Sequence, residues 1–391
     1  MAIKAETLEI YRTAIPMRAF EHAAASRRSA EAVVVRVALS DGRAGVGETL
    51  PRPYVTGESC ESVVADLTNV IWPTIAGAEL AAGELPQLPL SDSRGRSINA
   101  AACAAELALA DALLDEQAWR RLGGERPGIW PAGRKQRITA RVSGVLGSSE
   151  AAATRRRLFK LRLFGLRDFK LKLGFPPEID QANLAAVQRQ IGLDVGAGRC
   201  SLRVDANGGW SAERTIQMAA ELKRLGVCAV EQPVFCRAAE LAELARRCEL
   251  PLIADESLLT AADAEALLEA GPRIWWNIRI SKNGGIAASL ALARLAARHG
   301  VPFVIGCMVG ESGILSAAQR RLLALAPPPR FVEGNYGRFL LADDLTRPSL
   351  RFGYGGRLKP LRGDGLGVKL DPVKLACHGR LVACLGRDDN R

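Results

Sequence analysis

Apolar and polar residues follow two different rhythms along this chain, and the change falls near residue 130. Before it, Leu8–Tyr11 and Glu31–Leu39 have the β-branched content of strands, and Gly45–Glu48 begins another strand after a turn. Apolar residues then recur at helical spacing over 59–75 and 97–117. This first part is therefore predicted to be an antiparallel meander followed by helices.

From residue 136 onward, short apolar runs alternate with helix-like stretches. Such a repeat of strand and helix predicts a parallel sheet, and seven or eight repeats predict a TIM-type (β/α) barrel. Strands are predicted at 137–143, 166–171, 274–281, 302–306 and 330–332, and three more are predicted to end at Asp205, Glu231 and Asp255. Helices are predicted at 150–163, 177–191 and 311–324.

The chain of 391 residues is longer than the roughly 250 residues of a barrel alone. We therefore expect an α/β fold with an α+β capping domain at 1–130, a catalytic barrel at 136–340 and a C-terminal segment at 341–391. The Pro-, Gly- and Arg-rich stretch 125–135 is predicted to be a linker. The Gly- and Pro-rich tail is predicted to pack back on the capping domain and complete it.

Composition narrows the class of protein. The chain is 48% hydrophobic and 24% charged, as is ordinary for a globular enzyme. Its nine cysteines are scattered and never spaced as CxxC, which argues against structural zinc and a disulfide framework. The first residues lack the apolar core of a signal peptide, and no run approaches the roughly 18 apolar residues of a membrane span. We expect a cytoplasmic protein with no membrane partner.

The formal net charge of +11 raises the question of nucleic-acid binding. The arginines are dispersed over amphipathic helices, as at Arg155–Arg157, and aromatic residues make up only 5% of the chain. Solvated helix faces explain such a pattern, so no specific nucleic-acid partner is expected.

Charged residues stand at the ends of five consecutive predicted strands, at intervals of roughly 24 to 33 residues. Carboxylates end the middle three, at Asp205, Glu231 and Asp255. Because the carboxyl ends of barrel strands surround one active-site face, the three side chains should converge. Converging carboxylates repel one another unless a cation joins them, and Mg²⁺ prefers carboxylate oxygens. The spacing therefore predicts a Mg²⁺ site, which Mn²⁺ could also fill.

Lysines flank that predicted site on both sides. Lys170 and Lys172 share one face of a strand end, and Lys282 comes from across the barrel mouth. Two ammonium groups so close disfavour full protonation, so a lysine there can serve as a general base. A metal between two such bases can hold a carboxylate substrate while its α-proton is removed, with the metal neutralising the enediolate.

These motifs together resemble the enolase superfamily, in its muconate-lactonizing-enzyme subgroup. The segments concerned are Lys170–Lys172, Val204–Asn207, Val230–Pro233, Ala254–Ser257 and Lys282–Gly285. The resemblance implies that Asp205, Glu231 and Asp255 bind Mg²⁺ and that Lys172 and Lys282 form the acid/base pair. It also implies that Lys170 tunes Lys172, that Asn207 and Glu256 support the site, and that the protein is a homo-oligomer.

Histidine placement agrees with that subgroup. The mandelate-racemase branch uses a histidine base late in the barrel, but His22, His299 and His378 do not end a predicted strand here. The two-lysine branch is the one that fits.

The resemblance places substrate specificity in the capping loops and in the ends of the last two strands. It implies substrate contacts from Phe20, Tyr54, Cys307, Met308, Glu311 and Glu333. Dipeptide epimerases of the subgroup hold the substrate amine with an Asp-x-Asp motif, whereas this chain has Glu333 alone in that stretch. Glu311 is expected either near the reacting group or at the start of the next helix.

The expected activity is Mg²⁺-dependent racemisation or epimerisation of a small carboxylate substrate, either an N-acyl amino acid or a dipeptide. The alternative is a muconate-type cycloisomerase or a dehydratase of the o-succinylbenzoate-synthase type. In that case one lysine does the chemistry and the other stabilises charge.

Overall fold

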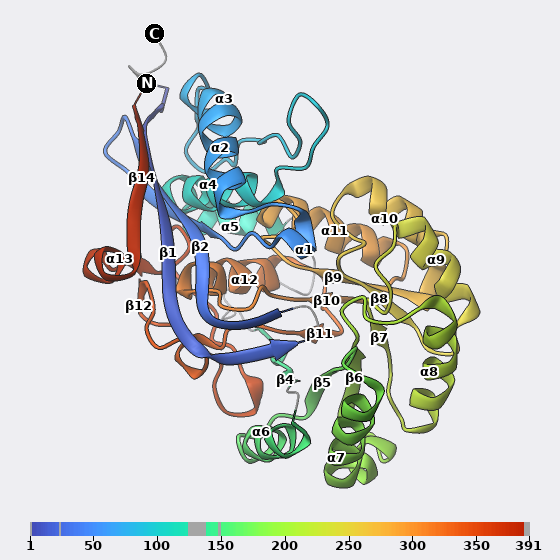
Figure 1. Ribbon diagram of the computed structural model, residues 1–391. Helices are drawn as coiled ribbons and strands as arrows, with labels where there is room; N and C mark the ends of the chain where they lie inside the picture. Colours follow the sequence, from blue (N-terminus) through green and yellow to red (C-terminus); the bar gives the residue numbers. More distant parts are fainter. Residues whose placement is uncertain (1, 23–24, 124–137, 148–149, 387–391) are drawn as a thin grey trace.

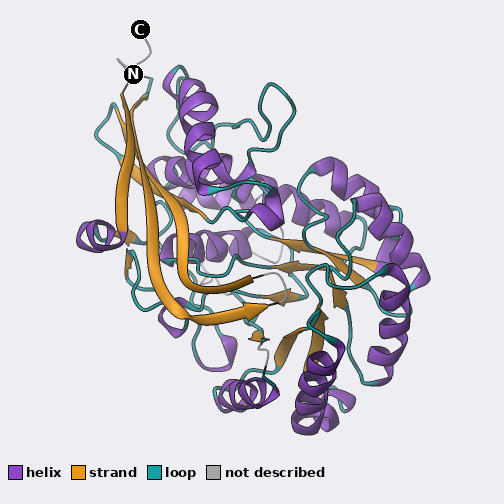
Figure 2. Ribbon diagram, in the orientation of Figure 1, coloured by secondary structure: helices purple, strands orange, loops and turns teal. Residues whose placement is uncertain are grey.

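The computed structural model describes residues 2–22, 25–123, 138–147 and 150–386, with the side chains of 19–22 and 25–27 left out. The linker predicted at 125–135 lies outside the described residues. Within them, a parallel barrel with helices around it carries an antiparallel sheet and several helices on one side (Figures 1 and 2).

Eight parallel strands form the barrel in chain order. They are β4 (Gly144–Leu146), β5 (Asp168–Lys172), β6 (Ser201–Asp205), β7 (Val230–Glu231), β8 (Leu252–Ala254), β9 (Ile274–Ile278), β10 (Phe303–Ile305) and β11 (Phe331–Val332). A parallel bridge between Val142 and Val332 joins the two ends, and Ser143 N donates to Val332 O at 2.7 Å. The predicted TIM-type barrel is confirmed.

Helices on the outside of the barrel connect consecutive strands. They are α6 (Ala151–Leu163), α7 (Pro177–Gly196), α8 (Ala212–Arg224), α9 (Ala238–Arg247), α10 (Ala261–Leu268), α11 (Ile286–Arg298) and α12 (Gly313–Leu325). The short 3-10 turns η2 (Gly271–Arg273), η3 (Gly337–Phe339) and η4 (Tyr354–Gly356) lie in connections, and β11 leads directly into η3.

The capping sheet has the order β14-β1-β2-β3 and is antiparallel. It comprises β1 (Ala5–His22), β2 (Ala25–Leu39), β3 (Ala44–Thr49) and β14 (Gly379–Gly386). Arg18 N donates to Leu340 O, and Ala342 N donates to Pro16 O, so the β1–β2 hairpin reaches the chain that leaves the barrel. In Figure 1 this long hairpin curves across the barrel opening.

The capping helices are α1 (Pro53–Thr56), α2 (Cys60–Asp66), the π-helix η1 (Leu67–Ile71), α3 (Trp72–Ala76), α4 (Asn99–Leu113) and α5 (Glu116–Gly123). Helices α2, α3 and α4 pack against the capping sheet, and α4 and α5 also contact the barrel helices α11 and α12. A Cβ on Gly47 of β3 would lie 1.8 Å from Ala104 O, and one on Gly45 would lie 2.1 Å from Ala108 O. Two glycines on one strand face and an alanine-rich helix thus allow α4 to approach the sheet closely.

Several element boundaries differ from the prediction, three of them in the capping helices and at the first barrel strand. The helix predicted at 59–75 is divided by a π-turn before Pro73, which has no N–H to continue the α-helical ladder. The helix predicted at 97–117 ends at Leu113, because Leu114 is extended and Asp115 accepts from Ala118 N at the start of α5. The first barrel strand is β4, later than the predicted 137–143.

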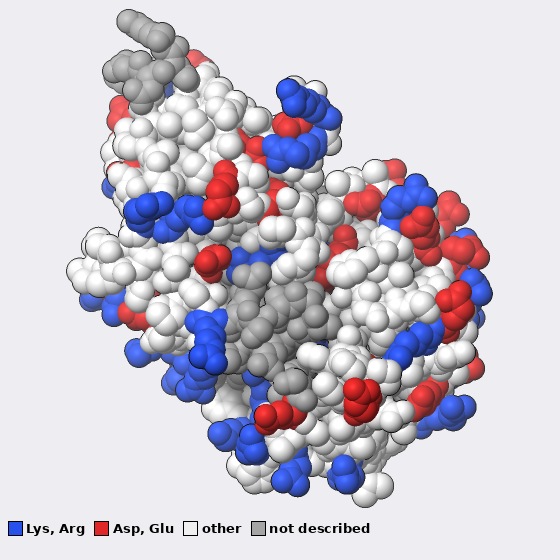
Figure 3. Space-filling model, viewed as in Figure 1, with Lys and Arg blue, Asp and Glu red and all other residues white. Residues whose placement is uncertain are grey.

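The C-terminal segment contains β12 (Thr346–Arg347), β13 (Lys369–Leu370) and α13 (Pro372–His378), and its β14 pairs with β1. The division at 1–130, 136–340 and 341–391 stays a prediction. No helix among the described residues is long and apolar enough to cross a membrane. On the face drawn in Figure 3, Lys and Arg lie in several separate groups with Asp and Glu among them.

Candidate active site

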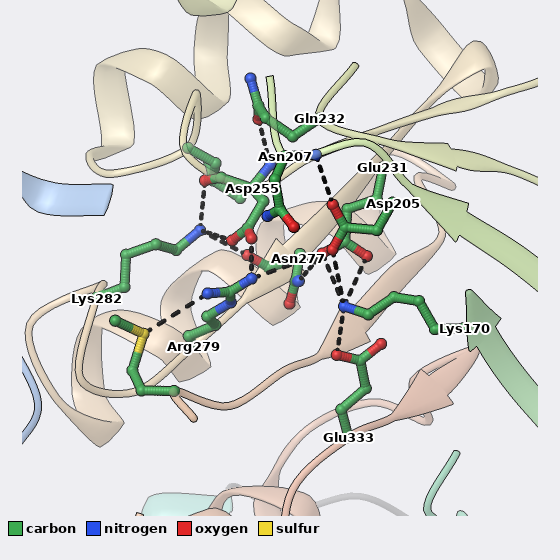
Figure 4. A network of polar contacts seen from close by, with 12 residues as sticks. Lys170, Asp205, Asn207, Glu231, Gln232, Asp255, Asn277, Arg279, Lys282 and Glu333 are labelled. Atoms are coloured by element: carbon green, nitrogen blue, oxygen red, sulfur yellow. Dashed lines mark hydrogen bonds and ion pairs between the residues drawn. The ribbon is translucent and has the colours of Figure 1, made fainter. Parts of the chain in front are cut away.

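Three buried carboxylates meet at the carboxyl ends of neighbouring barrel strands. Asp205 ends β6, Glu231 ends β7 and Asp255 directly follows β8, and each is 0% exposed. In the sheet register Asp205 is paired with Glu231 on one side and with Lys172 on the other. The barrel therefore brings the three carboxylates predicted from strand-end spacing into one cluster, which we call the carboxylate ring (Figure 4).

The two lysines of β5 both reach the carboxylate ring. Lys170 Nζ lies 3.0 Å from Glu231 Oε1, 3.3 Å from Asp205 Oδ2 and 2.7 Å from Glu333 Oε2. Lys172 Nζ donates to Asp205 Oδ2 at 2.6 Å and to Asn207 Oδ1 at 2.9 Å. Asn207 adopts the left-handed φ of 45° and its own N–H donates to Asp205, so the turn after β6 is shaped around this contact.

Lys282 reaches the carboxylate ring from the other side (Figure 4). Its Nζ donates to Asp255 O at 2.6 Å, Asp255 Oδ1 at 3.1 Å and Asn277 O at 2.9 Å. The side chain is 0% exposed and does not line the cleft described below. The structure thus brings Lys282 to the carboxylate ring but seats its ammonium group behind Asp255.

Arg279 is a fourth cation at the carboxylate ring, and it was not among the site residues predicted from the sequence. Its Nη2 contacts Asp255 Oδ2 and lies 3.6 Å from Glu231 Oε1, while Nη1 donates to Met308 Sδ at 3.6 Å. Asn277, two residues earlier on β9, donates to Glu231 at 2.9 Å. The available signal was a pair of polar residues at alternate positions in an otherwise apolar strand, which places both on the interior face.

Charge compensation sets the protonation preferences of these groups. Burial opposes ionisation of Asp205, but Lys172 and Lys170 outweigh it and lower its pKa below the usual range. Burial likewise opposes the charge on Lys170, yet Glu231, Glu333 and Asp205 raise its pKa well above the ordinary value. Burial lowers the pKa of Lys282 well below the ordinary value, and Arg279 adds to that shift.

A cleft of about 840 Å³, part of it open to solvent, lies over the carboxylate ring. The predicted site residues that line it are Tyr54, Lys170, Lys172, Asn207, Glu256, Cys307, Met308, Glu311 and Glu333. Arg52 of the capping domain, Arg157 of α6 and Tyr336 also line it, and sequence reasoning did not find them. Phe20 lies near the end of β1, and its side chain is outside the described part of the structure.

The three glutamates of the cleft wall have different surroundings. Glu333 accepts from Lys170 and, at 2.8 Å, from Arg203, which together overcome burial and lower its pKa to about 2. Glu311 accepts from Met308 N at 2.7 Å, and burial raises its pKa to about 8. Burial also raises the pKa of Glu256 to about 7. Ser312, rather than Glu311, caps α12.

No group of three or more His, Cys, Asp or Glu in the described ranges is arranged to hold a metal ion as it stands. The carboxylate oxygens of the ring contact Lys170, Lys172, Arg279 and Lys282 instead. The described cysteines are all free thiols.

Comparison with known proteins agrees with this geometry. A family model described as "Enolase C-terminal domain-like" matches residues 151–374. The N-succinyl-L-Arg/Lys racemase of Bacillus cereus is 26% identical over 324 residues, which cover 81% of this chain and 83% of that protein. Muconate cycloisomerase 1 of Pseudomonas putida is 29% identical over 360 residues, with 89% and 90% covered.

A solved structure shows the same fold over the whole chain. The dipeptide epimerase of Cytophaga hutchinsonii, complexed with Mg and the dipeptide D-Ala-L-Val, superposes with a TM-score of 0.79 at 20% identity, covering 99% of this chain and 100% of that one. The closed parallel barrel, its antiparallel cap and its ring of carboxylates and lysines define an enolase-type barrel enzyme. The chain belongs to the enolase superfamily, in the muconate-lactonizing-enzyme subgroup, and is an enzyme of that superfamily whose relatives named above are isomerases.

Proposed function

We propose that this enzyme removes and replaces the α-proton of a carboxylate substrate, as a Mg²⁺-dependent racemase or epimerase of an N-acyl amino acid or dipeptide. The observation that carries the proposal is the position of Lys172. Its ammonium group lines the cleft while Asp205 and Asn207 hold it at 2.6 and 2.9 Å, directly beside the carboxylate ring. A general base needs such a fixed position within reach of the substrate proton.

The donor set of the carboxylate ring fits a divalent metal of the Mg²⁺ type. Asp205, Glu231 and Asp255 supply hard carboxylate oxygens from three adjacent strand ends, and all three are fully buried. Buried carboxylates need positive charge, and here Lys170 and Arg279 contact them. These three residues would hold the metal, and when bound it would neutralise the negative charge that develops on the substrate carboxylate.

The chain's own residues account for the proton movements. Lys172 Nζ takes or returns the α-proton on the face of the substrate that lies toward β5. Lys282 lies on the opposite side of the carboxylate ring from Lys170 (Figure 4), and we assign it to the other face of the substrate. Lys170 and Arg279 keep positive charge close to the reacting carboxylate.

The contacts of Glu333 favour an N-acyl amino acid over a substrate with a free amine. A substrate ammonium group would need an available carboxylate in the cleft. Glu333 already accepts from Lys170 at 2.7 Å and from Arg203 at 2.8 Å. Glu311, whose pKa burial raises to about 8, is mainly neutral at pH 7 and is a weak partner for a cation. An amide nitrogen carries no charge and needs neither group.

A second candidate is favoured by the position of Lys282. Its side chain is fully buried behind Asp255, so Lys172 is the one acid/base lysine that lines the cleft as described. A cycloisomerase of the muconate type, or a dehydratase of the o-succinylbenzoate-synthase type, needs one lysine for the chemistry and one to steady charge. This arrangement would serve either reaction.

The test is solvent exchange in D₂O. The enzyme with Mg²⁺ is incubated with pooled N-succinyl and N-acetyl amino acids, dipeptides and muconates. The masses of the recovered compounds are then measured by mass spectrometry. We expect a gain of one mass unit in an N-acyl amino acid, loss of the gain in EDTA, and its recovery with Mg²⁺ or Mn²⁺. The double variant Lys172→Ala/Lys282→Ala is the matched inactive control. Exchange that persists undiminished in EDTA would refute the metal-dependent reaction.

A further inference from the structure

The two lysines at the carboxylate ring are held by different parts of the molecule. Lys172 belongs to β5, a central barrel strand, and its side-chain partners Asp205 and Asn207 also belong to the barrel. Lys282 lies on the loop between β9 and α11, which faces the capping domain. We call residues 281–287 the Lys282 loop.

Two elements of the capping domain, α4 and β3 with the residue after it, contact the Lys282 loop. Ser281 Oγ lies 2.8 Å from Thr49 Oγ1 at the end of β3 and accepts from Leu50 N at 3.0 Å. Asn99 Nδ2 donates to Lys282 O at 2.9 Å, and Glu106 accepts from Ile286 N at 2.5 Å. Glu106 also accepts from Ala287 N at 3.2 Å, so its carboxylate caps α11 from another domain.

The two polar contacts from α4 share one face of that helix. Asn99 and Glu106 are seven residues apart, which is two helical turns, so they project toward the same side. Asn99 is 1% exposed and Glu106 is 6% exposed. Asn99 also donates to Leu259 O, and it thereby joins the Lys282 loop to the segment after Asp255. A single rigid helix thus holds both ends of the Lys282 loop.

Two adjacent glycines in the loop, Gly284 and Gly285, allow its backbone to lie close to Glu106. Gly285 has a φ of 116°, a conformation that L side chains rarely adopt. A Cβ at this position would also lie 2.6 Å from the Glu106 carboxylate. The loop can therefore present its backbone N–H groups to Glu106 because no side chain stands between them.

We propose that helix α4 of the capping domain positions Lys282 for proton transfer through Asn99 and Glu106, while Lys172 is independent of the capping domain. This inference rests on the proposed function, since it assigns Lys282 a proton-transfer role. Asn99 and Glu106 are positioning residues that act through the Lys282 backbone. Its consequence is that a defect in α4 selectively slows α-proton exchange from the one isomer that Lys282 deprotonates, while inversion slows in both directions.

The first measurement is hydrogen–deuterium exchange of the full-length protein, which requires no substrate. Glu106→Gln and Asn99→Ala should each speed amide exchange in 282–287 by about tenfold, the loss expected for one capping contact. Peptides covering 168–173, which carry Lys172, should keep their wild-type rate. Unchanged exchange in 282–287, or an equal rise in both segments, would overturn the inference.

Glu48→Gln is the matched control. Glu48 is another buried capping-domain carboxylate, 1% exposed, and it accepts from Ser312 N at 3.1 Å and Leu315 N at 3.1 Å at the start of α12. This variant likewise replaces a buried carboxyl of the capping domain, but the one that contacts the start of α12 instead of the start of α11. It should speed exchange at 312–316 and leave 282–287 at the wild-type rate.

The second measurement uses both isomers of whichever N-acyl amino acid exchanges its α-proton with the wild-type enzyme. Glu106→Gln should slow deuterium incorporation into the isomer served by Lys282 by about tenfold or more and leave the other isomer within twofold. Equal slowing of both isomers would refute the positioning role. Absence of exchange from either isomer with wild-type enzyme would refute the proposed function instead, and the amide-exchange result would still decide whether α4 holds the Lys282 loop.

Discussion

Two sets of buried carboxyl groups in this protein behave in opposite ways. Asp205 and Glu333 at the active site face lysine and arginine side chains, which lower their pKa values in spite of burial. Glu48 and Glu106, at the junction of cap and barrel, face helix N-termini, and burial raises the pKa of each to about 7. We call this second pair the junction carboxyls.

The comparison shows how differently full and partial charges compensate burial. A helix N-terminus offers N–H groups and roughly half an elementary charge, which satisfies hydrogen bonding but does not outweigh desolvation. A lysine within 3 Å brings a whole charge into a site of low dielectric, and its effect on the carboxylate is larger. Cations thus keep Asp205 and Glu333 ionised, whereas the junction carboxyls, which join cap and barrel, hold their protons more readily.

The two sets of carboxyls should differ most in how much the free energy of unfolding falls when one member of each is replaced by glutamine. Glu333→Gln removes the carboxylate that pairs with the buried Arg203 and with Lys170 and leaves positive charge poorly compensated, so we expect a loss of about 3–5 kcal/mol in the free energy of unfolding. Glu48→Gln should cost less, on the order of 1–2 kcal/mol, because it loses a helix cap but strands no cation. Urea unfolding at pH 7 measures both. Equal losses of unfolding free energy in the two variants would contradict the difference between the two sets of carboxyls.

The second largest difference between the two sets should appear in how their contributions to the free energy of unfolding change with pH. A carboxyl whose pKa is 4.5 when unfolded and about 7 when folded binds its proton more tightly in the folded state. Its stabilising contribution is therefore full below pH 4.5 and is lost as the pH rises to 7. The advantage of wild type over Glu106→Gln should shrink by on the order of 1–3 kcal/mol between pH 4.5 and 8.

Glu333 at the active site should show the reverse trend. Glu333, with a folded pKa of about 2, contributes stability that is present above pH 4.5 and is lost as the pH falls toward 2. Urea midpoints measured across this range for wild type and Glu106→Gln test the junction carboxyls. If the difference in urea midpoint between wild type and Glu106→Gln stayed constant from pH 4.5 to 8, this would contradict the raised pKa of Glu106.

The smallest expected effect is a change in Mg²⁺ affinity when Arg279, the arginine at the carboxylate ring, is replaced. Arg279 contacts Asp255 and lies 3.6 Å from Glu231, two of the three proposed metal ligands. Arg279→Met removes that positive charge, so Mg²⁺ should bind about tenfold more tightly in calorimetry without substrate. Arg203→Met is the control, because Arg203 pairs with Glu333 and should change Mg²⁺ affinity less. Weaker Mg²⁺ binding by Arg279→Met would show that the arginine supports the metal.

Local pattern predicted the barrel and the carboxylate ring because both follow from position on a strand. Asp205, Glu231 and Asp255 each end an apolar run, and parallel register then brings them together. Asn99 and Glu106 could not be predicted in this way. Their partners are 183 and 180 residues away in the chain, and only domain packing brings them near. The same holds for the pairing of Glu333 with Arg203, 130 residues apart.

The extent of individual elements was also set by long-range contacts. The first strand was predicted over Leu8–Tyr11 and extends to His22, because β2 pairs along its whole length. Arg279 was missed for a related reason. Its charge is meaningful only once β9 is placed beside β8, where the guanidinium meets Asp255.

The most direct test of the central claim, that two lysines serve opposite faces of one α-carbon, is stereospecific exchange in D₂O by Lys172→Ala and Lys282→Ala. Each variant should lose deuterium incorporation from one isomer, by about 10²–10⁴-fold, while exchange from the other isomer persists and inversion stops in both. The contrary result is that one variant abolishes all exchange and the other leaves it intact for a single reactive isomer. That outcome would replace the racemase with a one-lysine cycloisomerase or dehydratase.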